Sequence, residues 1–118
     1  MIIKTNEIDG AALDWAVAKC EEYPMDIWYD EDELPMVRDD EVPEWKPSTD
    51  WAQGGPIIER EIAKIERFSD ALWEATAFTK NAQDFVHSGP TPLIAAMRCY
   101  VASKLGDIVE IPDELAAA

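Results

Sequence analysis

Residues 89–107 read GPTPLIAAMRCYVASKLGD and carry helix start and stop signals at their two ends. Thr91 is of a type that caps helix N-termini, and Pro92 stands at the first helical position, where its missing amide proton costs nothing. Gly106 stands where a helix C-cap is expected. Between these signals the apolar residues recur at helical spacing. The stretch therefore predicts a helix over residues 91–105 with a broad buried face.

A second helix is predicted over residues 9–22. Asp9 can cap the run GAALDWAVAKCEE that follows it. Leu13, Val17 and Cys20 fall at helical spacing and form the expected buried stripe. Trp15 lies at the margin of that stripe, where an indole can reach the surface.

The middle of the chain is ambiguous between helix and strand. In PIIEREIAKIERF, residues 56–68, the isoleucines follow helical spacing, which slightly favours a helix for the first half. In LWEATAF, residues 72–78, apolar and more polar residues alternate as they do in a strand. Residues 69–71 can form the turn of a hairpin that joins 62–68 to 72–78.

Length and composition indicate one domain, residues 1–118. The chain is 47% apolar, which is enough for one core. It has 25 acidic and 10 basic residues, for a net charge of −15, which disfavours direct binding to nucleic acid or to anionic membranes. There is no long apolar run or signal peptide, and two separated cysteines suit a reducing compartment. We therefore expect a cytoplasmic protein.

The negative charge is concentrated in residues 21–44, which hold eleven acidic residues and one basic residue. Three prolines exclude a continuous helix there, so we expect an acidic surface excursion at about 23–46 with a strand near 25–29. The central acidic run does not fit an EF-hand, because Pro35 stands where that loop needs glycine. We treat this run as a protein-interaction candidate. Its members are Asp30, Glu31, Asp32 and Glu33.

The sequence offers no motif for catalysis. His87 is the one histidine, and the two cysteines, at positions 20 and 99, lack the basic neighbours that would lower a thiol pKa. The Gly54-Gly55 pair is followed by Pro56 and not by the residues of a phosphate-binding loop. We therefore predict a protein that is not an enzyme and that uses no metal and no cofactor.

The most unusual segment is PSTDWAQGGPIIERE, residues 47–61, which combines hydroxyls, a carboxylate, an indole and an amide with two glycines. One interpretation is a compact capped turn; the other is a surface that recognises a small polar ligand. The N-terminus of the 91–105 helix is its expected companion, with Arg98 as a cation. The ligand-binding candidates are Trp15, Ser48, Thr49, Asp50, Trp51, Gln53, Gly54, Gly55, Thr91 and Arg98.

Three segments carry a family resemblance: GAALDWAVAKCE, PSTDWAQGGPIIERE and GPTPLIAAMRCYVASKLGDIVEIPDEL. They resemble the NinX-like family of small phage and prophage proteins. The resemblance implies a phage or prophage origin and a bacterial cytoplasmic setting, and it carries over no catalytic residue. It also favours strands over a helix for 62–68 and 72–78.

These elements predict an α+β fold. We expect one small, mostly antiparallel sheet, built from about residues 1–7, 25–29, 62–68 and 72–78, packed against the helices at 9–22 and 91–105. The tail Ile108–Ile111 is a candidate edge strand, which Pro112 would end. The loop 46–57 and the helix start at Thr91 are expected to line one end of the sheet.

Three functional hypotheses follow. The first is a non-enzymatic factor that binds a host or phage protein through its acidic segment. The second is a module that binds or sequesters a small polar ligand, a nucleotide included, with the loop at 47–61. The third is an acidic mimic of nucleic acid that binds a basic host protein. A homodimer is compatible with all three, because a small domain buries a modest fraction of its surface.

Overall fold

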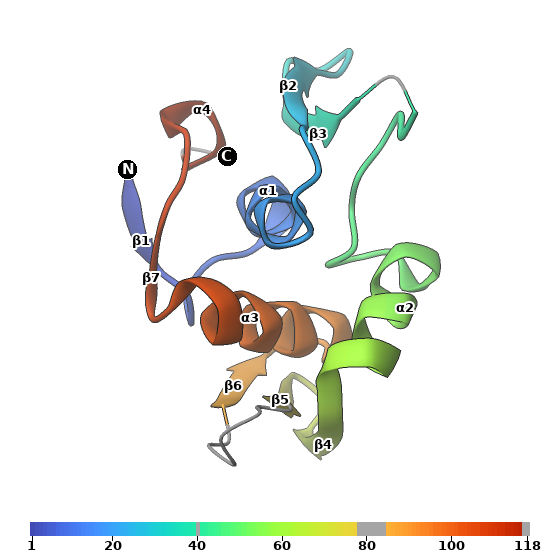
Figure 1. Ribbon diagram of the computed structural model, residues 1–118, viewed down its shortest axis with the longest axis vertical. Helices are drawn as coiled ribbons and strands as arrows, with labels where there is room; N and C mark the ends of the chain where they lie inside the picture. The colour runs from blue at the N-terminus through green and yellow to red at the C-terminus, as the bar shows by residue number, and fades with distance from the viewer. Residues whose placement is uncertain (40, 78–84, 117–118) are drawn as a thin grey trace.

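The computed structural model describes residues 1–39, 41–77 and 85–116. Helix α3 (Pro92–Leu105) crosses the centre of the molecule. It packs against a three-stranded sheet on one side and against α1 (Gly10–Cys20) and α2 (Trp51–Glu61) on others (Figure 1). The α+β class predicted from the sequence is confirmed.

Helix α3 begins and ends where its sequence signals predict. The Oγ1 atom of Thr91 accepts a hydrogen bond from the amide of Ile94 at 3.1 Å, and Gly106 ends the helix with a φ of 94°. That backbone angle favours glycine over other residues. Because neighbours cover α3 on several sides, most of its residues are buried, whereas Leu105 at its end is exposed.

Helix α1 matches the prediction for residues 9–22 to within two residues. Asp9 occupies the N-cap position, but its side chain makes no capping hydrogen bond. Leu13 and Val17 are fully buried, as the apolar stripe predicts, and Trp15 is half-buried. The helix therefore presents one face to the core and leaves the indole at the surface.

Residues 57–69 form a helix end followed directly by a strand. The predicted strands are confirmed as β4 (Ile62–Ser69) and β5 (Leu72–Ala77), with residue 78 outside the described residues. Strand β6 (Phe85–Gly89) completes an antiparallel sheet in the order β4-β5-β6.

The prediction of a loop over 46–57 is wrong from residue 51 onward, because α2 occupies it. Asp50 starts this helix: its carboxylate accepts a hydrogen bond from the amide of Ala52 at 2.9 Å. Gly-Gly-Pro lies inside the helix, and Ile57 of the same helix is buried in the core. Packing of this helix on α3 therefore outweighs the low helix propensity of these residues.

The prediction of one sheet is also wrong, since the strands form three separate sheets. Strand β1 (Ile2–Lys4) pairs with β7 (Ile108–Glu110), which confirms the tail as a strand. Strands β2 (Asp26–Tyr29) and β3 (Pro35–Arg38) form a hairpin of their own. In Figure 1 these two small sheets lie across α3 from the three-stranded sheet, which explains why they do not join it. The short helix α4 (Asp113–Ala116) follows β7.

The acidic segment returns to the core at two points. Val37 of β3 is buried, and β3 contacts α1 and α4. Farther along, Trp45 is buried and its Nε1 atom donates a hydrogen bond to the backbone carbonyl of Asp14 at 2.9 Å. The segment is thereby fastened to α1, with the turn between β2 and β3 exposed.

Candidate functional site

The structure brings the segment before α2 next to the start of α3. A pocket of about 230 Å³ lies between them. One wall comes from Ser48, Thr49 and Trp51 and the other from residues 91–94. Trp51 is 55% exposed, so its indole is available at the mouth. The two segments that the sequence analysis expected to be companions therefore form one pocket.

Glycine at position 54 allows this approach. A Cβ atom there would lie 2.7 Å from Cδ2 of Leu93 and would also overlap the carbonyl of Pro47. Such distances are too short for real side-chain atoms, so a larger residue would push α2 away from α3. Gly55, by contrast, has no such neighbours within 4 Å. The role of Gly54 is to let the two walls of the pocket meet.

Two further ligand-binding candidates serve to shape the segment. Gln53 accepts a hydrogen bond from the amide of Lys46 at 2.6 Å and donates one to the carbonyl of Glu44 at 2.8 Å. Asp50 caps α2 as described above. These side chains are bound to the chain itself and do not line the pocket.

Behind the pocket lies a buried carboxyl group that the sequence analysis missed. Asp14 is 5% exposed and accepts a hydrogen bond from the amide of Ser48, itself 1% exposed, at 2.9 Å. Burial raises the pKa of Asp14 to about 6, and hydrogen bonding by Ser48 partly opposes this rise. The Ser48 hydroxyl is buried and has no hydrogen-bond partner among the described residues. A signal existed, because Asp14 stands three and four positions before the buried Val17 and Ala18 on the same side of α1.

Arg98 does not provide a cation for this pocket. Its Nε atom donates to the carbonyl of Ile8 at 2.8 Å, and its Nη1 atom donates to the carbonyl of Ser88 at 3.0 Å. The side chain is half-buried, and burial lowers its pKa. Arg98 thus fastens α3 to two backbone segments. The expectation that it joins Thr91 in a ligand site is wrong, because Arg98 does not line the pocket.

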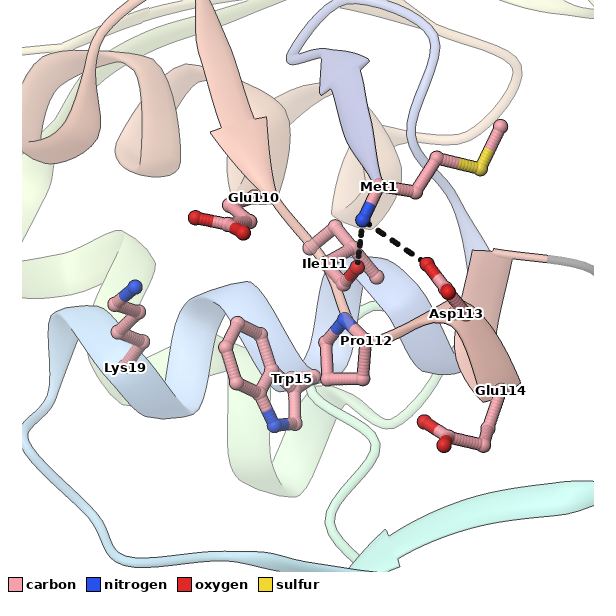
Figure 2. A pocket seen from close by; sticks show the side chains of 8 residues that line it. All are labelled: Met1, Trp15, Lys19, Glu110, Ile111, Pro112, Asp113 and Glu114. Atoms are coloured by element: carbon pink, nitrogen blue, oxygen red, sulfur yellow. Dashed lines mark hydrogen bonds and ion pairs between the residues drawn. The ribbon is translucent and has the colours of Figure 1, made fainter.

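Trp15 lies in a different hollow. It faces Pro112 in a pocket of about 450 Å³ that also includes Lys19 and Glu110 (Figure 2). The Nζ atom of Lys19 lies 5.3 Å from the centroid of the Trp15 ring. Trp15 therefore does not belong with Trp51, and the single ligand site expected from the sequence divides into two places.

The acidic run Asp30–Glu33 forms an ordered turn between β2 and β3. The carboxylate of Asp30 accepts hydrogen bonds from the amides of Asp32 and Leu34, both at 2.9 Å. The hairpin also presents large apolar side chains that are 46–57% exposed. These are Trp28, Tyr29 and Leu34. The turn thus combines carboxylates with an exposed apolar surface.

A partly buried polar cluster joins the three longer helices. The hydroxyl of Tyr100 donates to Glu21 at 2.9 Å, and Arg60 contacts both carboxylate oxygens of Glu21 at 2.7 and 2.8 Å. Burial raises the pKa of the Tyr100 hydroxyl above its ordinary value. The residues stand 39 to 79 positions apart, so no local pattern reveals this cluster. It fixes the end of α1 against α2 and α3.

The potential nucleophiles are held in their neutral forms. Burial raises the pKa of the Cys20 thiol to about 12 and that of Cys99 to about 11. Burial lowers the pKa of His87. Within residues 1–39, 41–77 and 85–116, no three histidine, cysteine or carboxylate side chains are grouped to hold a metal ion. No helix in those ranges is long and apolar enough to cross a bilayer.

Fold and surfaces together define a small acidic α+β protein with an acidic, aromatic hairpin and several surface hollows. Residues 4–104 match the family model of bacteriophage P22 NinX, and the chain therefore belongs to this family of phage accessory proteins. This confirms the resemblance seen in the sequence. No curated protein matches the chain.

Proposed function

We propose that the protein is a non-enzymatic factor that binds a host or phage protein through the β2–β3 hairpin. The observation that carries this proposal is the exposure of Trp28, Tyr29 and Leu34 beside a turn of four carboxylates. Aromatic side chains are the preferred anchors of protein interfaces, and adjacent charges select and orient the partner. Asp30 already orders the turn through two backbone hydrogen bonds, so docking does not have to order it.

Affinity capture from bacterial cells that produce the protein tests this proposal. Leu34→Ser removes an exposed anchor, and Glu31→Gln with Asp32→Asn removes charge while leaving the Asp30 carboxylate to hold the turn. Both variants should reduce retention of the same partner protein. The control pair is Glu59→Gln with Asp70→Asn, at exposed carboxylates on α2 and the β4–β5 turn. Equal retention by the hairpin variants and the parent would refute the assignment.

Salt dependence separates ordinary protein binding from nucleic-acid mimicry. A mimic relies on many charge contacts, so its complex should weaken steeply as salt rises. A complex anchored by Trp28 and Leu34 should weaken only modestly. Partner retention measured over a salt series distinguishes these two forms of the proposal.

A second candidate function is the binding of a small polar ligand in the pocket beside Trp51. The supporting observation is the pocket itself, with an exposed indole and the hydroxyl-bearing residues Thr49 and Thr91 in its walls. Its volume of about 230 Å³ suits a molecule smaller than a typical drug-sized ligand. None of the lining residues is charged, which favours a neutral ligand over a nucleotide.

Native mass spectrometry of gently purified protein tests the second candidate. A retained molecule should appear as a mass adduct in the parent and disappear in Trp51→Ala. The matched control is Trp28→Ala, which removes an exposed indole from the hairpin and should keep the adduct. An adduct that persists in Trp51→Ala would refute the pocket as its site.

A further inference from the structure

Three hollows follow one another along the outer side of α1. The first, of about 450 Å³, lies between Trp15, Lys19 and the segment 110–114 (Figure 2). The second, of about 320 Å³, shares Trp15 and Lys19 with the first and adds residues 23–25. The third, of about 700 Å³, shares residues 23–25 with the second and reaches Trp45. Because neighbouring hollows share walls, we treat them as one surface, the α1 groove.

Aromatic and apolar side chains line the middle of the α1 groove. Trp15 is half-buried, and Tyr23 is exposed while its ring packs edge-on against Trp45 at a centroid distance of 5.4 Å. Pro24 and Met25 lie between these two aromatic positions. The groove thus offers an apolar floor in its middle, between Trp15 and Trp45, and a mainly polar lining beside residues 110–114.

The one basic side chain in the described lining of the α1 groove lies over the Trp15 indole. Lys19 already holds its Nζ atom 5.3 Å from the ring centroid, which is within the range of a cation–π contact. This contact is intramolecular and exposed, so it is weak and leaves the indole available for packing by an apolar side chain.

Carboxylates border the α1 groove at both ends, and Lys19 is the one basic side chain among its described lining residues. Those at one end belong to the acidic segment and those at the other to the C-terminal tail. They are Asp26, Asp39 and Glu41, and Glu110, Asp113 and Glu114. Most form no ion pair within the described chain; the exception is Asp113, which contacts the Met1 amine at 3.1 Å. This charge attracts a basic ligand and repels phosphates.

We propose that the α1 groove binds a basic amphipathic segment of a partner protein. Lysine or arginine residues at the two ends of that segment meet the carboxylates, and apolar side chains in its middle pack on Trp15 and Tyr23. Because Lys19 lies at the middle of the groove, the middle of the bound segment is uncharged. The inference rests on the proposed function, since the partner is a protein, but it uses a surface separate from the hairpin turn.

A synthetic peptide with lysines at both ends and leucines in the middle is the probe for this proposal. Its binding is measured by fluorescence anisotropy against the full-length protein, beside a peptide with glutamates in place of the lysines. Glu110→Lys with Glu114→Lys should weaken binding of the basic peptide about fivefold to tenfold. Lys19→Glu should strengthen it by about threefold.

Matched charge changes elsewhere provide the controls. Glu59→Lys with Asp70→Lys, on α2 and the β4–β5 turn, changes the net charge by the same amount as the Glu110 and Glu114 pair. Lys64→Glu on β4 changes it by the same amount as Lys19→Glu. These variants should leave peptide affinity within about twofold of the parent. Equal effects from the groove and control pairs would overturn the proposal, because binding would then follow net charge alone. Failure of the parent to bind the basic peptide would overturn it as well.

Failure of the α1 groove and failure of the proposed function give different results. If the peptide does not bind but cellular partner capture still depends on Leu34, the groove is wrong and the hairpin function stands. If the peptide binds in the groove but capture does not depend on the hairpin, the hairpin assignment is wrong and the groove stands.

Discussion

Replacing Asp14 by asparagine should stabilise the protein at neutral pH. The carboxyl group is 5% exposed and lies in α1 against Ser48. Asparagine keeps the Oδ1 acceptor for the Ser48 amide and removes a charge that the core solvates poorly. The Ser48 hydroxyl, which has no hydrogen-bond partner among the described residues, is available to accept from the new amide group.

The size of the effect follows from the pKa of Asp14. Burial raises this pKa from 3.8 to about 6, so the folded protein holds the proton more tightly than the unfolded chain. The parent therefore gains stability as pH falls from about 6 towards 3.8, and loses that gain as pH rises. A rise of about two units in the pKa of Asp14 corresponds to about 3 kcal/mol in the free energy of unfolding. This is the upper limit of the gain expected for Asp14→Asn at pH values above 6.

Urea unfolding followed by tryptophan fluorescence across this pH range measures the difference. Asp14→Asn and the parent should be equally stable near pH 4, and the variant should become more stable by up to about 3 kcal/mol near pH 7.5. Asp9→Asn is the control, because Asp9 is exposed at the start of the same helix and makes no capping bond. It should change stability by less than about 0.5 kcal/mol throughout. A variant that is no more stable than the parent at neutral pH would refute the reasoning.

Three further changes test the packing around α3, each by the free energy of unfolding. Gly54→Ala should cost about 1–3 kcal/mol because its Cβ has no room, whereas Gly55→Ala should cost less. Tyr100→Phe should cost about 1–3 kcal/mol, because it removes the hydroxyl that donates to Glu21 at 2.9 Å; an unchanged stability would show that this bond is dispensable. Arg98→Met keeps much of the side-chain stem but loses two backbone contacts, and should cost about 2–4 kcal/mol.

The sequence was sufficient where local signals determine the structure. The ends of α3 are set by Thr91, Pro92 and Gly106, because capping depends on atoms within one turn of the helix end. The alternation in residues 72–77 predicts β5 for a similar reason, since strand pairing buries alternate side chains. Both predictions use interactions between residues that are close in sequence.

Helix α2 was missed because contacts distant in the chain maintain it. Gly54, Gly55 and Pro56 each disfavour a helix locally. What holds them in one is the fit of Gly54 against Leu93, 39 positions away, and the burial of Ile57. The division into three sheets has the same origin, because β1 finds its partner β7 more than a hundred residues later. No local pattern encodes such pairings.

The sequence analysis predicted which two segments meet in the pocket, but not which of the candidate residues line it. Trp51 and Thr91 do share a pocket, because the helix that follows Asp50 packs on α3. Trp15 and Arg98 were added on residue type alone, and residue type does not say which way a side chain points. Arg98 satisfies two backbone carbonyls, a demand that arises only once the chain has folded.

The position of the acidic residues on the surface likewise depends on contacts between segments that are distant in the chain. In the sequence, residues 21–44 and the tail after Gly106 are two separate acidic blocks. The pairing of β7 with β1 and the docking of Trp45 onto α1 bring both blocks to the same helix. Carboxylates that would repel one another in a continuous patch are thereby spaced along an aromatic floor with Lys19 between them. A partner with basic ends and an apolar middle relieves that repulsion at both ends simultaneously, which gives the arrangement selectivity for one charge pattern over uniform positive charge.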